Sequence, residues 1–199
     1  MRKWIGILCI ILGVVCLMAA IGFLLYNRWE AGAAEETSRE LLQDVQRIIS
    51  LETTPEEAPS APVTTEMETI RVDGYDCIGI LSVPVLELEL PILADWSYKK
   101  LKKAPCHYYG SYNEADFVIA AHNYKSHFGR LSELQAGDLV IFTDVHGNVH
   151  SYEVVLLETL PPTATQEMIA SGFALSLYTC TPGGGNRVTV RCNRQVVMK

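Results

Sequence analysis

The stretch LYTCTPGGGNRVTVRC, from Leu177 to Cys192, decides the fold that we expect. An apolar strand pattern ends at Cys180, a glycine-rich turn follows, and a second strand pattern begins at Arg187. Side chains alternate between the two faces of a strand. On the first strand, the predicted apolar face consists of Phe173, Leu175 and Leu177, and the opposite face of Ser176, Tyr178 and Cys180. On the second strand, the apolar face consists of Val188 and Val190, and the opposite face of Arg187, Thr189 and Arg191. If the strands form a hairpin, Cys180 and Arg187 lie close together, whereas Arg191 lies ~13 Å further along.

Further strand patterns precede this hairpin. They cover residues 78–83, 85–91, 117–121, 139–143 and 150–157, and the two strands of the hairpin itself cover 173–180 and 187–197. Residues 145–148, Val-His-Gly-Asn, are a turn signal between two of them and predict another hairpin. Short strands separated by turns, without a repeat or a βαβ pattern, predict an all-β sandwich or barrel.

The N-terminal segment differs from the rest of the chain. Residues 4–26 carry no charge and are long enough to cross a bilayer as a helix. A cleavable signal peptide is the alternative, but its apolar region is only ~7–15 residues long. Arg2 and Lys3 precede the span and acidic residues dominate beyond Arg28, so we expect a cytoplasmic N-terminus and an extracellular remainder. The net charge of −7 gives no indication of nucleic-acid binding.

Two further segments are expected before the strands begin. Thr37 and Glu40 fit a helix-capping box, and apolar residues then recur at helical spacing to residue 51, which predicts a short amphipathic helix. We expect it to pack on the domain or on the membrane surface. Residues 53–65 are rich in Pro, Thr and Glu and predict a stalk. The predicted division is residues 1–27 for the anchor, 28–69 for helix and stalk, and 70–199 for the barrel.

Cysteine and histidine are the residue types in this chain that could act as a nucleophile, an acid–base group or a metal ligand. Cys9 and Cys16 lie in the anchor; Cys77, Cys106, Cys180 and Cys192 lie outside it, where one disulfide at most is expected if Cys180 stays a free thiol. No spacing typical of a zinc site is present, and we expect no metal or cofactor. We interpret His146 and His150 as solvated and His107 as structural. His122 ends the apolar run 117–121 and opens a loop, which is a typical place for a catalytic residue.

Three motifs together resemble the sortase family, the membrane-anchored cysteine transpeptidases of Gram-positive bacteria. The family signature Thr-Leu-x-Thr-Cys reads Ser-Leu-Tyr-Thr-Cys at 176–180, and the family arginine matches Arg187. The family histidine matches His122 in Ala-Ala-His-Asn, with alanine where glycine is common, followed by Phe128 and Leu131. Residues 78–84 and 90–92 are similar to the family's opening strands. The resemblance covers roughly residues 70–197.

The resemblance implies a closed eight-stranded β-barrel and a defined reaction. The substrate would be a secreted protein with a C-terminal Leu-Pro-x-Thr-Gly-like sorting motif. Cys180 would attack the threonine carbonyl to form a thioester, and an amine of a lipid II-type cell-wall precursor or of a pilin would resolve it. His122 would transfer protons and Arg187 would stabilise the oxyanion. Thr179 and Asn123 are candidate substrate-binding residues.

Other functions remain open at this stage. A cysteine peptidase would share Cys180 and His122 but release its product to water, and a non-catalytic envelope-binding barrel would use Cys180 structurally. Pilus-polymerising relatives often carry an Asp-Pro-aromatic lid and a second apolar span. The stalk has no such tripeptide and the sequence stops at Lys199, so we expect wall anchoring rather than pilus assembly.

Overall fold

The computed structural model describes residues 2–52 and 67–195. The chain divides into two units, Met1–Ala33 and Ala34–Lys199. Helix α1 runs through Arg2–Glu52 and so contributes to both. The predicted stalk at 53–65 lies outside the described residues.

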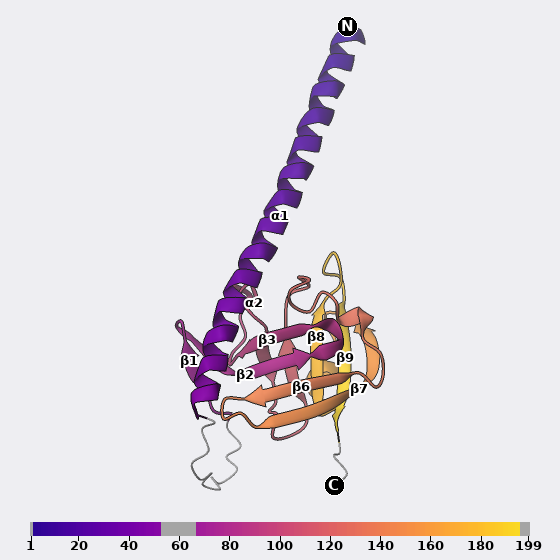
Figure 1. The fold of residues 1–199 in the computed structure, drawn as a ribbon. Coiled ribbons are helices and arrows are strands. Elements are labelled where there is room, and N and C mark those ends of the chain that lie inside the picture. Colours follow the sequence, from indigo (N-terminus) through magenta and orange to yellow (C-terminus); the bar gives the residue numbers. More distant parts are fainter. Residues whose placement is uncertain (1, 53–66, 196–199) are drawn as a thin grey trace. The chain divides into compact units, whose positions relative to one another are not determined.

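The second unit contains all the strands and the shorter helices (Figure 1). The strands are β1 (Ile70–Val72), β2 (Tyr75–Val83), β3 (Leu88–Leu93), β4 (Cys106–Tyr109), β5 (Phe117–Ala120), β6 (Leu139–Asp144), β7 (Val149–Leu160), β8 (Leu175–Cys180) and β9 (Arg187–Arg194). The helices are α2 (Tyr98–Leu101) and α3 (Thr165–Ile169), with 3₁₀ turns η1 (Pro84–Leu86) and η2 (Leu131–Glu133). Turn η1 interrupts the strand expected over 85–91, because Pro84 starts the turn and Glu87 adopts φ 51°.

The nine-stranded sheet closes into a barrel. Its order is β1-β2-β3-β4-β5-β8-β9-β7-β6, and β6 pairs back with β2, so the eight strands from β2 to β9 form a closed ring. The β3–β4 and β5–β8 pairs are parallel and the other pairs are antiparallel. The expected eight-stranded barrel is therefore confirmed, and the sandwich is excluded.

A glycine permits the closure between β2 and β6. Gly79 has φ +149° and pairs with Asp144. A Cβ at this position would lie 2.1 Å from the carbonyl oxygen of Thr143. Only a residue without a side chain allows the two backbones to come this close.

The barrel interior holds one cluster of apolar side chains. The cluster includes Leu81, Ile92, Phe117, Ile119, Phe142, Tyr152, Leu175, Leu177 and Val190. The predicted inward faces of β8 and β9 are confirmed for Leu175, Leu177 and Val190, which are fully buried there, and for Val188, which packs against them. The prediction is wrong for Phe173, which precedes β8 and whose ring lies 5.8 Å from the Arg191 guanidinium outside this cluster. The end of each strand, where the polar residues of interest lie, is thus fixed by a packed interior.

The first unit is the apolar part of α1. It contains the one helix among the described residues that is long and apolar enough to cross a membrane. Its large apolar side chains are exposed, from Trp4 (77% of its surface) to Tyr26 (53%). An exposed apolar helix surface is stable in lipid rather than in water.

The helix does not restart at Thr37. Residue 37 lies inside α1, so the capping box predicted there is wrong. Residues 27–36 are mostly good helix formers, and Gly32 costs only ~1 kcal/mol in a helix, which does not end it.

The C-terminal part of α1 packs on the barrel. Leu41, Val45 and Ile49 are buried in a second apolar cluster, which also contains Cys77, Leu93, Leu101, Cys106 and Ala120. These helix residues recur at the four-residue spacing that forms one face. The second unit begins at Ala34 and therefore includes this segment of α1, whereas its first strand, β1, begins at Ile70.

This packing predicts the result of two truncations. A chain starting at residue 66 should unfold at a lower temperature than one starting at Ala34, because it lacks the three buried side chains of α1. Burying such side chains stabilises by ~1.5–3 kcal/mol each, so a loss of roughly 5 kcal/mol is expected. Thermal unfolding followed by circular dichroism measures the difference, and equal midpoints would contradict an integral role of this helix segment.

Candidate active site

The β8–β9 hairpin places Cys180 opposite Arg187. The two residues are the last register pair before the turn, so their side chains lie on the same side of the sheet. The turn is closed by a hydrogen bond from Thr181 N to Asn186 O, 2.9 Å, and by one from Asn186 N to Thr181 Oγ1, 3.0 Å. The expected hairpin and its register are confirmed.

The glycines of this turn have a conformational role. Gly183 and Gly184 have φ of +84° and +76°, a region that side chains disfavour. The reversal exposes the turn and leaves Cys180 and Arg187 half-buried. Arg187 Nη1 donates to the carbonyl oxygens of Gly184 and Asn186, each at 3.1 Å, so the guanidinium lies over its own turn.

Arg191 has a different environment from Arg187. It is 1% exposed, and its Nε donates to Glu158 Oε1 at 2.7 Å. Its Nη atoms donate to Ser176 Oγ at 2.8 Å and to the Glu167 carbonyl oxygen in α3 at 2.6 Å. The face of β8 and β9 that points away from the barrel interior is thus covered at this level. Arg191 is a buried structural cation, which its strand parity alone did not predict.

Strand β5 brings His122 to the same end of the sheet. Ala120 pairs with Tyr178 in parallel register, and Ala121 N donates to Tyr178 O at 3.1 Å. Thr179 Oγ1 donates to Ala121 O at 2.9 Å. His122 and Cys180 therefore directly follow two backbone segments that are hydrogen bonded to each other.

The two candidate substrate-binding residues lie in contrasting places. Thr179 is 3% exposed, and its hydroxyl serves the β5–β8 link. Its side chain thus helps to position the two strand ends, and its contact with substrate stays a prediction. Asn123 is exposed in the loop that follows His122. It stays a candidate for contact with substrate.

The loop after His122 is compact. Phe128 N donates to His122 O at 3.2 Å, and Gly129 N donates to Tyr124 O at 2.9 Å. The Tyr124 ring lies between two histidine rings, with centroids 5.0 Å from His122 and 5.6 Å from His127. These contacts hold the His122 backbone and one side of its ring.

His127 is the buried member of this group. It is fully buried, and burial, with a smaller contribution from His122, lowers its pKa to about 4. It is therefore neutral at neutral pH. Sequence analysis did not distinguish its burial, because His127 lies in a polar loop without a strand or helix period.

The other cysteines beyond the apolar part of α1 are unsuited to nucleophilic chemistry. Burial raises the pKa of the Cys77, Cys106 and Cys192 thiols to about 12. All are free thiols, so the possible disulfide is not formed. Among the described cysteines beyond the anchor, Cys180 alone is partly exposed. A nucleophilic cysteine must be accessible, which leaves Cys180 as the candidate among them.

The remaining histidines have structural contacts. His107 ring nitrogens lie 3.1 Å from Ala94 O and 2.8 Å from Gly110 O, as expected for a structural residue. His146 is 2.9 Å from Glu68 and partly exposed. His150 was expected to be solvated, but its side chain is 16% exposed and packs on Tyr112. In the part of the chain that the structure describes, no group of three His, Cys, Asp or Glu residues could hold a metal ion.

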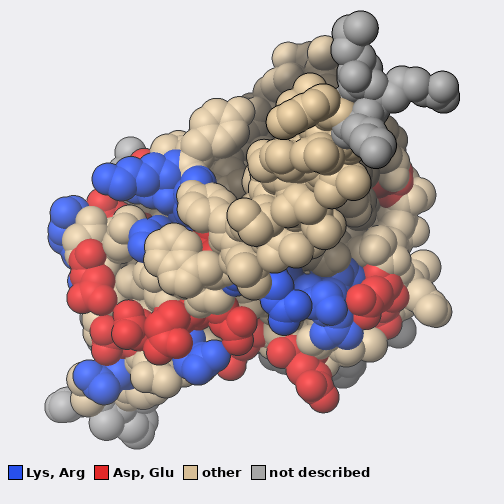
Figure 2. Space-filling view, turned by 90° about the horizontal axis from the view of Figure 1, so that it is seen from above, with Lys and Arg blue, Asp and Glu red and all other residues tan. Residues whose placement is uncertain are grey.

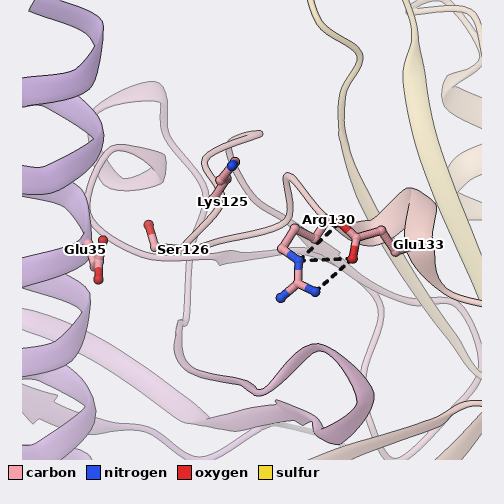
Figure 3. A pocket seen from close by; sticks show the side chains of 5 residues that line it. All are labelled: Glu35, Lys125, Ser126, Arg130 and Glu133. Atoms are coloured by element: carbon pink, nitrogen blue, oxygen red, sulfur yellow. Dashed lines mark hydrogen bonds and ion pairs between the residues drawn. The ribbon is translucent and has the colours of Figure 1, made fainter. Parts of the chain in front are cut away.

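A cleft opens beside the His122 loop (Figure 3). It has a volume of about 450 Å³ and is lined by Glu35, Lys125, Ser126, Arg130 and Glu133. Arg130 and Glu133 form an ion pair of 2.8 Å, and Arg130 also donates to Leu86 O. No local sequence pattern indicates this cleft, because Glu35 belongs to α1 and the other four residues follow β5, far away in the sequence.

The chain is thus a closed eight-stranded barrel in which Cys180, Arg187 and the segment before His122 meet at one end of the sheet. The sortase domain family model matches residues 81–195, which is more than half of the chain. The chain belongs to the sortase family. No curated protein matches it significantly.

Solved structures agree with this fold. Sortase C1 from Streptococcus agalactiae has a TM-score of 0.56 and 24% identity, over 64% of this chain and 72% of that chain. A Clostridium perfringens sortase D5 transpeptidase has a TM-score of 0.58 and 17% identity, over 83% and 99%. A pilus-related sortase C of Group B Streptococcus has a TM-score of 0.56 and 23% identity, over 83% and 94%. At these identities the likeness concerns the fold.

Proposed function

We propose that this sortase cleaves a Leu-Pro-x-Thr-Gly-like sorting signal between Thr and Gly through a Cys180 thioester and transfers the protein to an amine. The observation that carries the proposal is that Cys180 and Arg187 are paired across the β8–β9 hairpin. The residue before His122, Ala121, is hydrogen bonded to the two residues before Cys180. Thiolate, proton donor and fixed cation are the three groups that acyl transfer from a peptide requires.

The proposed reaction has two balanced halves. The Cys180 thiolate attacks the threonine carbonyl carbon, and the bond to the glycine nitrogen breaks as His122 gives that nitrogen a proton. An acceptor amine then loses a proton to His122, attacks the thioester and forms a new amide, which regenerates the Cys180 thiolate. The net reaction exchanges one amine for another and needs no cofactor.

Arg187 is proposed to stabilise the oxyanion of both tetrahedral intermediates. Its guanidinium is permanently charged, and the turn carbonyls of Gly184 and Asn186 hold it at the sheet end. Fixed donors at an oxyanion typically contribute ~2.7–4 kcal/mol to the barrier.

Substitutions of Arg187 and of Arg191 are expected to change the transfer rate of one peptide substrate differently. Arg187→Ala should reduce the transfer rate ~10²–10³-fold with little change in thermal midpoint, and Arg187→Lys should recover little because the rigid fork of donors is lost.

Arg191→Ala serves as the contrast. It removes the partner of Glu158 and a donor to Ser176, so its main effect should be loss of folding stability, typically ~3–5 kcal/mol for a broken buried pair. Arg191→Ala should keep most of the activity at temperatures at which it stays folded. A folded Arg191→Ala without activity, beside an active Arg187→Ala, would overturn the assignment.

The acceptor is proposed to be the amine of a cell-wall precursor. A pilin lysine is the second candidate, because several solved structures with this fold are described as pilus sortases. The cleft beside the His122 loop is a candidate route for the acceptor because of its place next to this loop; its lining carries the carboxylates of Glu35 and Glu133 and the cations of Lys125 and Arg130.

The proposed function is tested by identifying the reaction products. The full chain is incubated with a Leu-Pro-x-Thr-Gly peptide, alone and with a glycine-based amine or a pilin-derived lysine peptide, and products are identified by mass. Amine-dependent formation of the new amide is expected. Hydrolysis that no amine diverts would identify a cysteine peptidase instead.

The apolar part of α1 is the basis for a proposed membrane anchor. We propose that the apolar part of α1 spans the cell membrane once, with the N-terminus in the cytoplasm and the barrel outside. The basic pair Arg2 and Lys3 before the span supports this direction.

A further inference from the structure

A basic and aromatic surface stands out on an otherwise acidic chain. It surrounds α2 and consists of Trp96, Tyr98, Lys99, Lys102 and Lys103, which we call the α2 patch. Residues 95–103 contain Lys99, Lys100, Lys102 and Lys103 against the single acid Asp95, a net charge of +3 on a chain of −7. Such a local excess is not explained by folding, because the barrel buries none of these charges completely.

Local structure fixes the direction in which the α2 patch points. Ser97 caps α2 by accepting a hydrogen bond from Lys100 N at 3.1 Å, and Leu101 is buried in the apolar cluster under α1. The inward Leu101 leaves Tyr98 74% exposed, and Lys99 and Lys102 are exposed as well. Lys100 differs, because it pairs with Asp95.

The aromatic members add an apolar component. The Trp96 ring contacts Tyr98 with centroids 4.9 Å apart and Tyr108 with centroids 5.9 Å apart. Tryptophan and tyrosine beside lysine is the composition of protein surfaces at the bilayer–water boundary, where rings sit among headgroups and ammonium groups meet phosphates.

Chain length keeps the α2 patch close to the bilayer. Trp96 and Leu101 belong to the same apolar cluster as Leu41, near the beginning of the second unit. The apolar run ends at Tyr26, and residues 27–41, which lie within α1, rise ~22 Å at 1.5 Å per residue. Within the second unit, Leu101 of α2 belongs to the same apolar cluster as Leu41 and Val45 of α1. Figure 2 shows Lys and Arg side chains gathered in groups on the face seen there.

We propose that the α2 patch docks on the anionic lipid headgroups of the membrane that holds α1. The lysines supply attraction to the negative surface, and the exposed Tyr98 supplies the interfacial ring, with the half-buried Trp96 packed against it. Docking would restrict how the barrel turns about its anchor and so fix the direction from which membrane-bound substrates reach Cys180. The inference rests on the proposed membrane anchoring but is independent of the transfer reaction.

The test uses the full chain in lipid nanodiscs. Amide hydrogen exchange of residues 96–104 is compared in nanodiscs of phosphatidylglycerol and of phosphatidylcholine, after size-exclusion chromatography has shown that the chain is inserted. Exchange at least ~5-fold slower in the anionic lipid is expected, and high salt should remove the difference. A chain that fails to insert into nanodiscs would refute the membrane anchor. The chromatography step therefore distinguishes failure of the anchor from failure of the α2 patch to dock.

Charge reversal with a matched control completes the test. Lys99→Glu with Lys102→Glu should abolish the lipid-dependent protection, since each lysine near an anionic surface contributes roughly fivefold to the association. Arg47→Glu with Arg71→Glu changes the net charge equally at exposed positions outside the patch and should leave the protection intact.

Three results would overturn the proposal. These are equal exchange in the two lipids, equal effects of the two double variants, and protection by a soluble polyglycerol phosphate but not by anionic lipid. The last would assign the α2 patch to a wall polymer.

Discussion

Cys180→Ala is expected to abolish both cleavage and amine transfer while the barrel stays folded. The thiolate is the only group proposed to bond to substrate carbon, so no other group can replace it. The side chain is half-buried at the end of β8 and contributes little to the packed interior, which predicts an unchanged thermal midpoint. Product formation below a hundredth of wild type is expected in the peptide assay, and activity above a tenth would exclude Cys180 as the nucleophile.

Cys106→Ala is the matched control for that result. It makes the same substitution at a thiol that is fully buried in the cluster under α1, whose pKa burial raises to about 12. Activity should persist, with a modest loss of thermal stability from the cavity left behind. A thiol-directed reagent should label Cys180 in the wild type and leave Cys106 unlabelled, as mass analysis of the peptides can show.

The hairpin could be predicted from sequence because local rules dominate there. Alternating apolar residues set the faces of β8 and β9, and glycine is needed where φ is positive, so the opposition of Cys180 and Arg187 follows from the sequence. The barrel itself followed from the family resemblance. Periodicity alone left a sandwich open, because pairing of β2 with β6 is a long-range contact that no local pattern encodes.

The parts that could not be predicted depend on tertiary contacts. The continuation of α1 through Thr37 reflects its burial against the barrel more than its capping signal. Arg191 has the same strand parity as Arg187 but is enclosed by Glu158 and α3, which only the folded chain brings together. The short strands β1 and β4 lack a full alternating pattern and were missed for that reason.

His122→Ala is expected to lower the rate of transfer by ~10²–10⁴, the usual range for loss of a general acid or base. The Tyr124 ring and the hydrogen bond from Phe128 N hold His122 in a compact loop, so the substitution should leave the fold intact. The measurement is steady-state transfer to an amine, with the thermal midpoint recorded for each variant. An His122→Ala enzyme with more than a tenth of wild-type activity would exclude a proton-transfer role.

His127→Leu separates chemistry from structure in the same loop. The neutral His127 ring is fully buried, and no hydrogen-bond partner of its nitrogens is found among the described residues, so an apolar side chain of similar size should preserve activity. Its folded pKa of about 4 lies below the unfolded value near 6.5, so the unfolded chain binds the extra proton. Wild-type stability should therefore fall by roughly 3 kcal/mol as the pH drops from about 6.5 to 4. In His127→Leu this loss should be absent while the pH dependence of transfer is retained. If His127→Leu removes activity in a folded enzyme and His122→Ala does not, the proton-transfer role belongs to the buried histidine.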